Sequence, residues 1–155
     1  MADTMTQIQR SQCMSRIKSK NTGPEIAVRR IVHRMGCRFR LKPQRLPGSP
    51  DIVLTRHRAV IFVHGCFWHR HKNCRFAYMP KSRKMFWQGK FEENLSRDRR
   101  AMQKLRKLGW SALVIWECRV SDPDWLRCRI SSFLSKGNSM AASPDAVAGE
   151  KKSIA

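Results

Sequence analysis

One short segment constrains this chain more than any other. Residues 63–74 read Val-His-Gly-Cys-Phe-Trp-His-Arg-His-Lys-Asn-Cys, so three histidines, two cysteines and a Phe-Trp pair lie beside a polar Lys-Asn turn. A hydrophobic core gains little from such a mixture, whereas a metal-supported site that works on a charged, stackable substrate needs all of these groups. The segment therefore indicates zinc and nucleic acid as the two ligands to look for.

The charge balance supports the nucleic acid. The 155 residues include 32 Lys and Arg against 11 Asp and Glu, a formal net charge of +21. Such a charge repels itself unless an anionic partner is present. The acids and lysines of residues 137–155 cancel, so the whole excess lies in residues 1–136. We therefore expect the folded part of the chain, and not a basic tail, to bind nucleic acid.

Cellular setting follows from what the sequence lacks. It contains neither an apolar run of roughly 18 residues, the length of a membrane span, nor a signal-peptide core at its N-terminus. We expect a cytoplasmic, monomeric protein with one main domain and no membrane contact. Without a secretory signal, its six cysteines are better explained as metal ligands or free thiols than as disulfides.

The hydrophobic pattern predicts a mixed α/β fold, a sheet flanked by helices. In chain order we expect helix 21–36, strands 37–41, 51–54 and 59–63, helix 91–108, strand 111–116 and helix 122–134. The basic amphipathic pattern at 7–19 fits either an arm helix or a frayed end. We divide the chain into an N-terminal arm (1–20), a main domain (21–136) and a disordered Gly-, Ser- and Ala-rich tail (137–155).

Four residues form a candidate zinc site. Cys66, His71 and Cys74 lie within nine residues, and Cys118 follows a predicted strand. A Cys3His set suits tetrahedral zinc, although the spacing is not that of a standard finger, and His69 could replace His71. The alternative is a group of ordinary buried or solvated cysteines and histidines. Because four protein ligands close the coordination shell, the ion would be structural, and catalysis would need another centre.

Acids provide that second centre. Four are not explained by a terminus, a cap or a solvated helix face: Glu25, Asp51, Asp98 and Glu117. Asp51 opens an apolar strand after a Pro-Gly-Ser-Pro turn, where it can hold Mg²⁺ or simply cap the turn. Asp98 lies on the apolar face of its helix and needs a partner there: an arginine such as Arg40, a histidine or a hydrated metal. Glu25 also fits a capping box with Thr22, and Glu117 fits a supporting role beside Cys118.

Histidines and aromatics complete the candidate set. His64 and His69 can move a proton at neutral pH during attack on a phosphodiester, although a lone histidine is usually structural. Phe67, Trp68 and Trp87 lie in basic surroundings, where aromatics stack on bases or wedge between base pairs. Core filling is the commoner role of any single tryptophan.

Five segments taken together resemble the very short patch repair endonucleases: residues 21–25, 46–51, 63–74, 94–99 and 116–118. The resemblance runs in order from about residue 10 to 135, and the Gly-Cys-Phe-Trp-His block is highly specific. It implies a restriction-endonuclease-like fold. It also implies nicking of double-stranded DNA beside the thymine of a T:G mismatch that deamination of 5-methylcytosine leaves.

The same resemblance implies a role for each candidate residue. It implies that Mg²⁺ is held by Asp51 and the main-chain carbonyl of Val63, with His69 as general base. Waters around the ion would be organised by Glu25, His64 and Asp98. A structural zinc would be held by Cys66, His71, Cys74 and Cys118. The duplex would be entered beside the mismatch by Phe67, Trp68 and Trp87, and from the other groove by Met14 on the N-terminal helix.

The chain departs from the family pattern in two places. Lys72 and Asn73 separate the last two ligands of the zinc loop, where some relatives have one residue, and Val63 occupies a position that is threonine in some relatives. The second acid and the lysine of the common nuclease signature are absent at Phe62 and His64, which agrees with histidine doing the proton work. Two alternatives remain: a restriction or recombination nuclease without mismatch preference, and a non-enzymatic zinc-containing DNA-binding protein. The flanking bases, the paired methyltransferase and binding of the mismatch-repair matchmaker protein stay open.

Overall fold

The computed structural model describes residues 6–17, 20–41 and 45–140. Its sheet has three strands in the order β1 (Ile52–Leu54), β2 (Ala59–His64), β3 (Ser111–Trp116). β1 pairs with β2 in antiparallel fashion through a one-turn 3₁₀ link, and β2 pairs with β3 in parallel. The predicted mixed sheet and its hairpin are thus confirmed.

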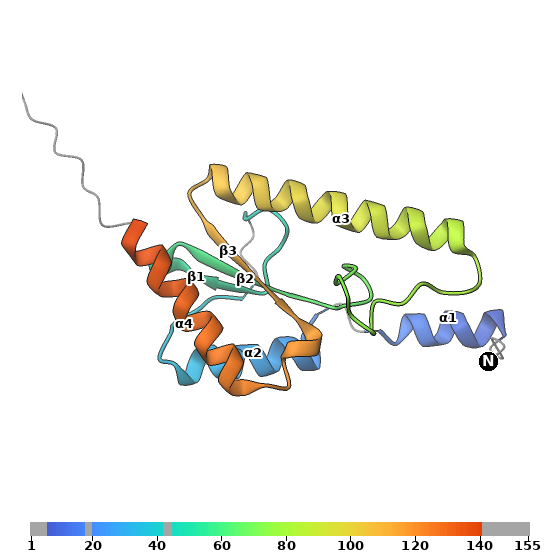
Figure 1. Cartoon of the computed structure of the whole chain (residues 1–155), viewed down its shortest axis with the longest axis horizontal. Coiled ribbons are helices and arrows are strands. Elements are labelled where there is room, and N and C mark those ends of the chain that lie inside the picture. Colours follow the sequence, from blue (N-terminus) through green and yellow to red (C-terminus); the bar gives the residue numbers. More distant parts are fainter. Residues whose placement is uncertain (1–5, 18–19, 42–44, 141–155) are drawn as a thin grey trace, which may run out of the picture.

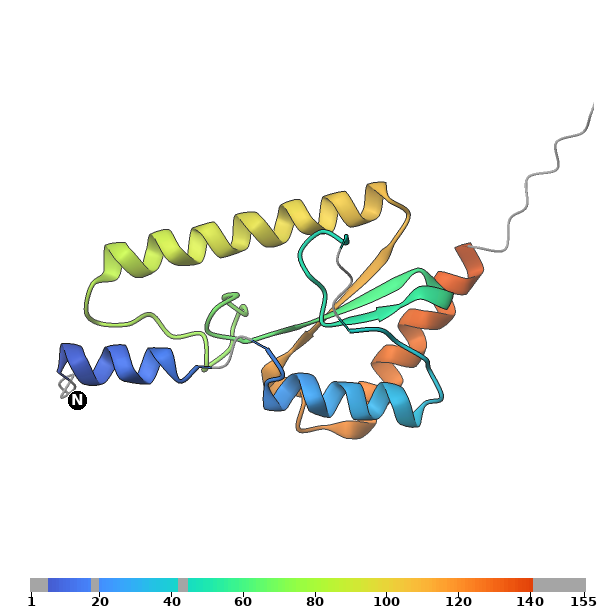
Figure 2. The same cartoon turned by 180° about the vertical axis from the view of Figure 1, so that it is seen from behind.

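Helices cover both faces of this sheet (Figure 1). α2 (Gly23–Arg34) and α4 (Pro123–Met140) pack on one face and share the larger apolar core with it, while α3 (Lys84–Lys107) packs on the other face through Leu105. α1 (Gln7–Ser15) forms the N-terminal arm, and its first turn is closed by a Thr6–Gln9 capping box. Seen from either side, α1 and the first half of α3 project in the same direction, with the loop that follows β2 between them (Figures 1 and 2).

Three predicted boundaries were wrong. α3 begins at Lys84 and not at Phe91, because Met85 and Phe86 in its first turn are exposed, and only Trp87 there packs on Phe91 one turn later. Residues 37–41 form no strand; Arg40 alone bridges Val53. α4 continues past Leu134 to Met140, into the predicted tail. Residues 141–155 of that tail, and residues 1–5 and 18–19 of the arm, lie outside the described residues.

The candidate functional residues lie at the edge of the sheet where β2 and β3 end. Because the two strands are parallel, His64 and Trp116 finish at the same edge and are register partners. β1 runs the opposite way, so Asp51, just before its first residue, also lies there, and its N–H donates to the Ile61 carbonyl at 3.1 Å. The loop 65–83, which carries the motif, leaves from this edge. In the part of the chain that the structure describes, no helix is long and apolar enough to cross a membrane.

Candidate active site

Asp51 is a partly buried carboxylate held by the backbone. Its Oδ2 accepts a hydrogen bond from the Val63 N–H at 2.7 Å. Burial raises its pKa to about 6; the Val63 N–H opposes this shift, and the nearby Glu25 carboxylate adds to it. A buried acid next to a second acid is stabilised by a cation, and oxygen donors are the ligands that Mg²⁺ prefers.

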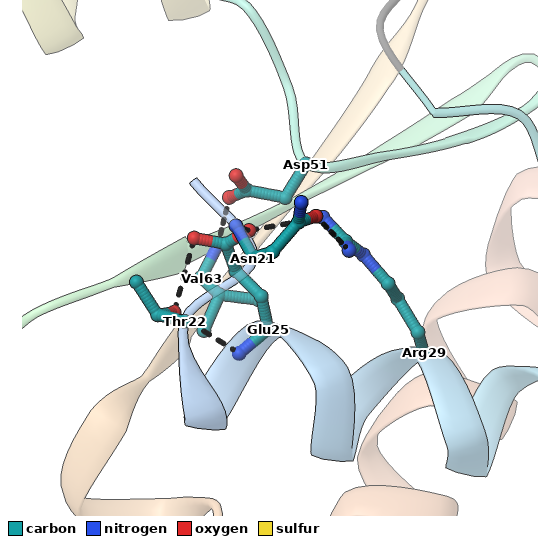
Figure 3. A network of polar contacts seen from close by, with 6 residues as sticks. All are labelled: Asn21, Thr22, Glu25, Arg29, Asp51 and Val63. Carbon is teal, nitrogen blue, oxygen red and sulfur yellow. Dashed lines mark hydrogen bonds and ion pairs between the residues drawn. The ribbon is translucent and has the colours of Figure 1, made fainter. Parts of the chain in front are cut away.

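Glu25 caps α2, as its sequence context predicts. Figure 3 shows its carboxylate accepting from the Asn21 N–H at 2.9 Å, the Thr22 hydroxyl at 3.0 Å and the Arg29 guanidinium at 2.9 Å. These contacts close the N-terminus of α2 and hold the carboxylate still. In the same view the Asp51 carboxylate lies beside that of Glu25, so the capping acid also faces the candidate metal position.

His69 and Asp98 form a close polar pair in the site. The His69 Nδ1 and Asp98 Oδ2 atoms are 2.6 Å apart. Burial alone would raise the pKa of Asp98, but the hydrogen bond and charge of His69 outweigh it and lower that pKa. The prediction that Asp98 needs a partner is confirmed, and the partner is this histidine and not Arg40. With Nδ1 donating to the carboxylate, the His69 Nε2 is left to accept a proton.

His64 packs against the histidine of this pair. Its ring stacks on that of His69, with centroids 3.8 Å apart and planes 10° apart. Burial lowers the pKa of His64 to about 4, and repulsion from His69 acts in the same direction. His64 is therefore neutral at physiological pH. The side-chain donor atoms of His64, His69 and Asp98 lie close enough to hold a metal, but the short His69–Asp98 hydrogen bond fits a proton-transfer pair better.

All of these groups face one cavity of about 740 Å³. Its lining includes the six residues to which the resemblance gives catalytic or magnesium roles: Glu25, Asp51, Val63, His64, His69 and Asp98. They come from the start of α2, the two ends of the hairpin, the loop after β2 and the middle of α3. Four distant parts of the chain thus meet where a water and a phosphodiester have room to approach.

The four predicted zinc ligands form a second cluster, separate from the cavity. The donor atoms of Cys66, His71, Cys74 and Cys118 all lie within 4.8 Å of one another. The His71 Nδ1 is 3.6 Å from the Cys66 sulfur and 3.4 Å from the Cys118 sulfur. Around a tetrahedral zinc with bonds of about 2.3 Å to sulfur and about 2.0 Å to nitrogen, the sulfur-to-nitrogen separation is about 3.5 Å. The donor set therefore fits zinc, and it contains His71 and not His69.

Electrostatics also favour a cation at this second cluster. Burial raises the pKa of the Cys66 thiol to about 12, so without a cation this group stays protonated. A bound zinc would stabilise the thiolate instead. The loop is supported by Trp116, whose ring stacks on His71 at 4.3 Å, and by Glu117, whose Oε2 accepts from the Cys66 N–H at 3.4 Å. The expected supporting role of Glu117 agrees with this contact.

The three predicted DNA-entering aromatics form one cluster centred on Phe67. Its ring centroid lies 5.2 Å from Trp68 and 5.5 Å from Trp87, and it also touches Phe91 and Tyr78 at 5.2 Å each. Phe91 is buried and anchors the cluster on α3, whereas Tyr78 is 64% exposed. Met14 is 40% exposed on α1. The sequence did not single out Tyr78, because one tyrosine in a basic loop has no periodic signal.

Asn94 is a site residue that the sequence pattern did not single out for a role. It is buried on α3, and its Nδ2 donates to the Trp68 carbonyl at 3.2 Å while its Oδ1 accepts from Arg97. It thereby ties the aromatic loop to the helix that carries Asp98. A polar residue four positions before Asp98, on the same inward face, was the available signal.

Known proteins are similar to this chain over most of its length. A family model described as DNA mismatch endonuclease Vsr matches residues 2–75. The chain is 46% identical to the type II nicking enzyme V.XorIIP of Xanthomonas oryzae pv. oryzae, over 86% of this chain and 98% of that one. It is 41% identical to the DNA mismatch endonuclease Vsr of Escherichia coli, over 76% of this chain and 75% of that one.

A solved structure supports the fold independently. The catalytic domain of the homing endonuclease I-Bth0305I superposes with a TM-score of 0.53 at 18% identity, covering 76% of this chain and 98% of that domain. Identity this low speaks for the fold alone. The identities to the nicking and mismatch enzymes go further: the chain belongs to the very short patch repair (Vsr) endonuclease family and is a DNA endonuclease.

Proposed function

We propose that this chain, a monomer of restriction-endonuclease-like fold, nicks double-stranded DNA on the 5′ side of the thymine in a T:G mismatch. The observation that carries the proposal is that one loop supplies both His69, which pairs with Asp98 of α3, and the neighbouring Phe67–Trp68 pair. The residue proposed for proton transfer and the aromatic pair suited to opening a base stack thus lie side by side. The mismatch enzyme of Escherichia coli, at 41% identity, supports the same reading.

His69 acts as the general base. Because Asp98 accepts its Nδ1–H at 2.6 Å, the ring is fixed in the tautomer whose Nε2 can take a proton from the attacking water. Stacking on neutral His64 fixes the plane of the ring without adding a competing charge. Asp98 stays ionised and stabilises the imidazolium that forms.

Asp51 and the main-chain carbonyl of Val63 hold Mg²⁺, and Glu25 orients the waters around it. The fit rests on the oxygen donors, on the raised pKa of Asp51 and on the fixed Glu25 carboxylate beside it. Bound Mg²⁺ neutralises the charge that develops on the phosphate and on the leaving 3′ oxygen. The four ligands Cys66, His71, Cys74 and Cys118 hold a structural zinc, which fixes the loop and takes no part in the chemistry.

Phe67, Trp68 and Trp87 enter the duplex, and Met14 contacts it from the other groove. Unstacking a base step costs a few kcal/mol, and this cost is smallest where pairing is already weak. A T:G pair is such a place, whereas T:A is not. The partly exposed aromatic cluster, held by Phe91 and Asn94, is suited to this entry.

Single-turnover nicking of duplexes that differ only in T:G or T:A tests the proposal, with and without Mg²⁺. We expect fast nicking of the mismatch only, and only with the metal. Trp68→Ala should lose this preference more than it loses general DNA affinity, since a stacked aromatic contributes about 1 to 3 kcal/mol. Trp110→Ala, in the link between α3 and β3, is the control. Equal cleavage of both duplexes across a library of flanking sequences would instead indicate a nicking enzyme without mismatch preference.

A further inference from the structure

The cavity that holds the candidate catalytic residues extends along α3 on both sides of Asp98. There its wall is formed by three cationic side chains of the helix, Arg97, Arg100 and Lys104. All three are exposed to solvent. The mechanism proposed above uses none of them, so this part of the cavity, the α3 groove, has no role yet.

Helix geometry places the three cations in one row. Their spacing of three and four residues puts them on the same face of α3. With a rise of about 1.5 Å per residue, the row is about 10.5 Å long. Measured along the duplex axis, one strand of B-DNA advances about 3.4 Å per phosphate, so a row lying along that axis spans about three phosphate steps.

The acids on this wall are already engaged. Glu93 pairs with Lys90, with 3.2 Å between Oε2 and Nζ, and Asp98 pairs with His69. Arg97 donates to Asn94 and Arg100 donates to the Ser96 carbonyl, both neutral acceptors. The α3 groove therefore keeps an excess of positive charge. This charge can attract the phosphates on either side of the reacting one.

The opposite wall packs closely against α3. The turn of residues 47–49 lines it and is seated directly on the helix. Gly48 has φ +78°, and a Cβ at this position would lie 2.6 Å from that of Ala101 and 3.2 Å from the Phe62 ring. Only glycine allows this approach, which sets the width of the groove between Asp51 and α3.

We propose that the α3 groove binds the sugar-phosphate backbone of the strand that is nicked, through Arg100 and Lys104, at the phosphates next to the reacting one. The proposal rests on the assignment of Asp51 and His69 to catalysis and adds the path of the strand to it. Guanidinium and ammonium groups are suited to phosphate oxygens, and a rigid wall holds the strand so that the reacting phosphate meets the water near His69.

Charge-removing variants on two faces of the same helix test this path. Arg100→Gln and Lys104→Gln each remove one groove cation. Arg99→Gln and Arg106→Gln remove the same charge from exposed positions on the opposite face of α3 and serve as matched controls. We expect the slope of log K against log salt to become less negative by about 0.9 for each groove variant and about 1.8 for the double variant. The controls should leave the slope unchanged.

Neutral methylphosphonates placed one at a time in the DNA locate the contact. For the wild type, neutralising a phosphate within three positions of the nick on the cut strand should weaken binding. In Arg100→Gln or Lys104→Gln that penalty should disappear at one position, because its cation is already gone. Penalties that persist in both groove variants, that vanish equally in the Arg99 and Arg106 controls, or that couple only to the uncut strand would overturn the proposal. Failure of the catalytic assignment would appear separately, as nicking that survives in Asp51→Asn.

Discussion

Two clusters, built within a few residues of each other, use histidine for opposite purposes. His69 lies against the Asp98 carboxylate and faces a cavity of about 740 Å³. His71 lies among three cysteine sulfurs and stacks on Trp116. Arg70 between them adopts φ +53°, a left-handed turn that lets two residues so close in sequence face different partners. The identity of the residue does not decide its role; the partner that another element brings to it does.

Donor chemistry separates the two clusters further. The cysteine set is closed by four soft donors, which suits a structural zinc. The Asp51 cluster offers oxygen donors and leaves space for water and phosphate, which suits Mg²⁺ and catalysis. Trp116 stands between them, stacked on His71 and edge-on to His64 at 5.5 Å. The closed cysteine cluster thus keeps rigid the loop that supplies His69 to the open cluster.

Removing one zinc ligand should have the largest effect on the protein as a whole. A structural zinc can contribute about 10 to 16 kcal/mol, as much as the entire stability of a typical domain. We expect Cys118→Ser to lose zinc and to unfold or melt far below the wild type, measured by metal content and circular dichroism. Cys128→Ser, the same change at an exposed position on α4, should behave as wild type. A Cys118→Ser protein that melts like the wild type without zinc would refute the structural role.

Removing Asp51 should abolish function and spare the fold. In Asp51→Asn we expect nicking to fall by at least about 10³-fold, which corresponds to about 4 kcal/mol of lost transition-state stabilisation. DNA binding and zinc content should persist. Because the folded state raises the pKa of Asp51 above 3.8, to about 6, its ionised form is disfavoured by folding at neutral pH, and the variant should melt higher in metal-free buffer.

The control for this change is Asp122→Asn, an exposed acid that caps α4 by accepting from the Trp125 N–H at 3.0 Å. Asparagine caps a helix equally well, so this variant should nick and melt as the wild type does. Nicking by Asp51→Asn at a rate comparable to this control would show that the metal is held elsewhere.

Exchanging the two histidines for alanine tests their division of labour directly. The nicking rate of His69→Ala should fall by about 10²- to 10⁴-fold, the usual contribution of a general base, and this variant should keep its zinc. His71→Ala should lose zinc and stability first and activity as a consequence. The opposite pattern of metal content would mean that base and ligand are interchanged.

Much of this could be read from the sequence, because local patterns specify local structure. The apolar runs predicted β2 and β3, and Pro24 with Gly36 predicted α2 close to its true limits. The apolar residues in the first turn of α3, Met85, Phe86 and Trp87, are consecutive and show no helical periodicity, so its start was placed seven residues late. A single bridge at Arg40 resembled a strand because extended chain and paired strand have the same pattern.

Long-range pairing was the part that the sequence could not settle. Spacing placed His71 in the zinc set but left His69 as an alternative ligand, and Asp98 had three possible partners. Only the packing of α3 against the loop after β2 shows that Asp98 reaches His69 and that Asn94 holds the Trp68 carbonyl. The cationic row of the α3 groove was likewise visible as charge but not as the wall of a cavity.

The smallest effect that we predict is a metal-dependent shift in the pH profile. Protons and Mg²⁺ compete for Asp51, whose burial raises its pKa to about 6. At Mg²⁺ below saturation, the nicking rate should therefore fall as the pH drops through about 6, since the protonated acid no longer binds the ion. Each tenfold increase of Mg²⁺ above its dissociation constant should move this midpoint down by up to about one pH unit. Zinc content should be measured across the same profile, because loss of the Cys66 ligand set in acid would also lower the rate and must be separated from protonation of Asp51. A midpoint that ignores the Mg²⁺ concentration would assign the acidic limb to a group other than Asp51 and would weaken the contrast between the open and the closed cluster.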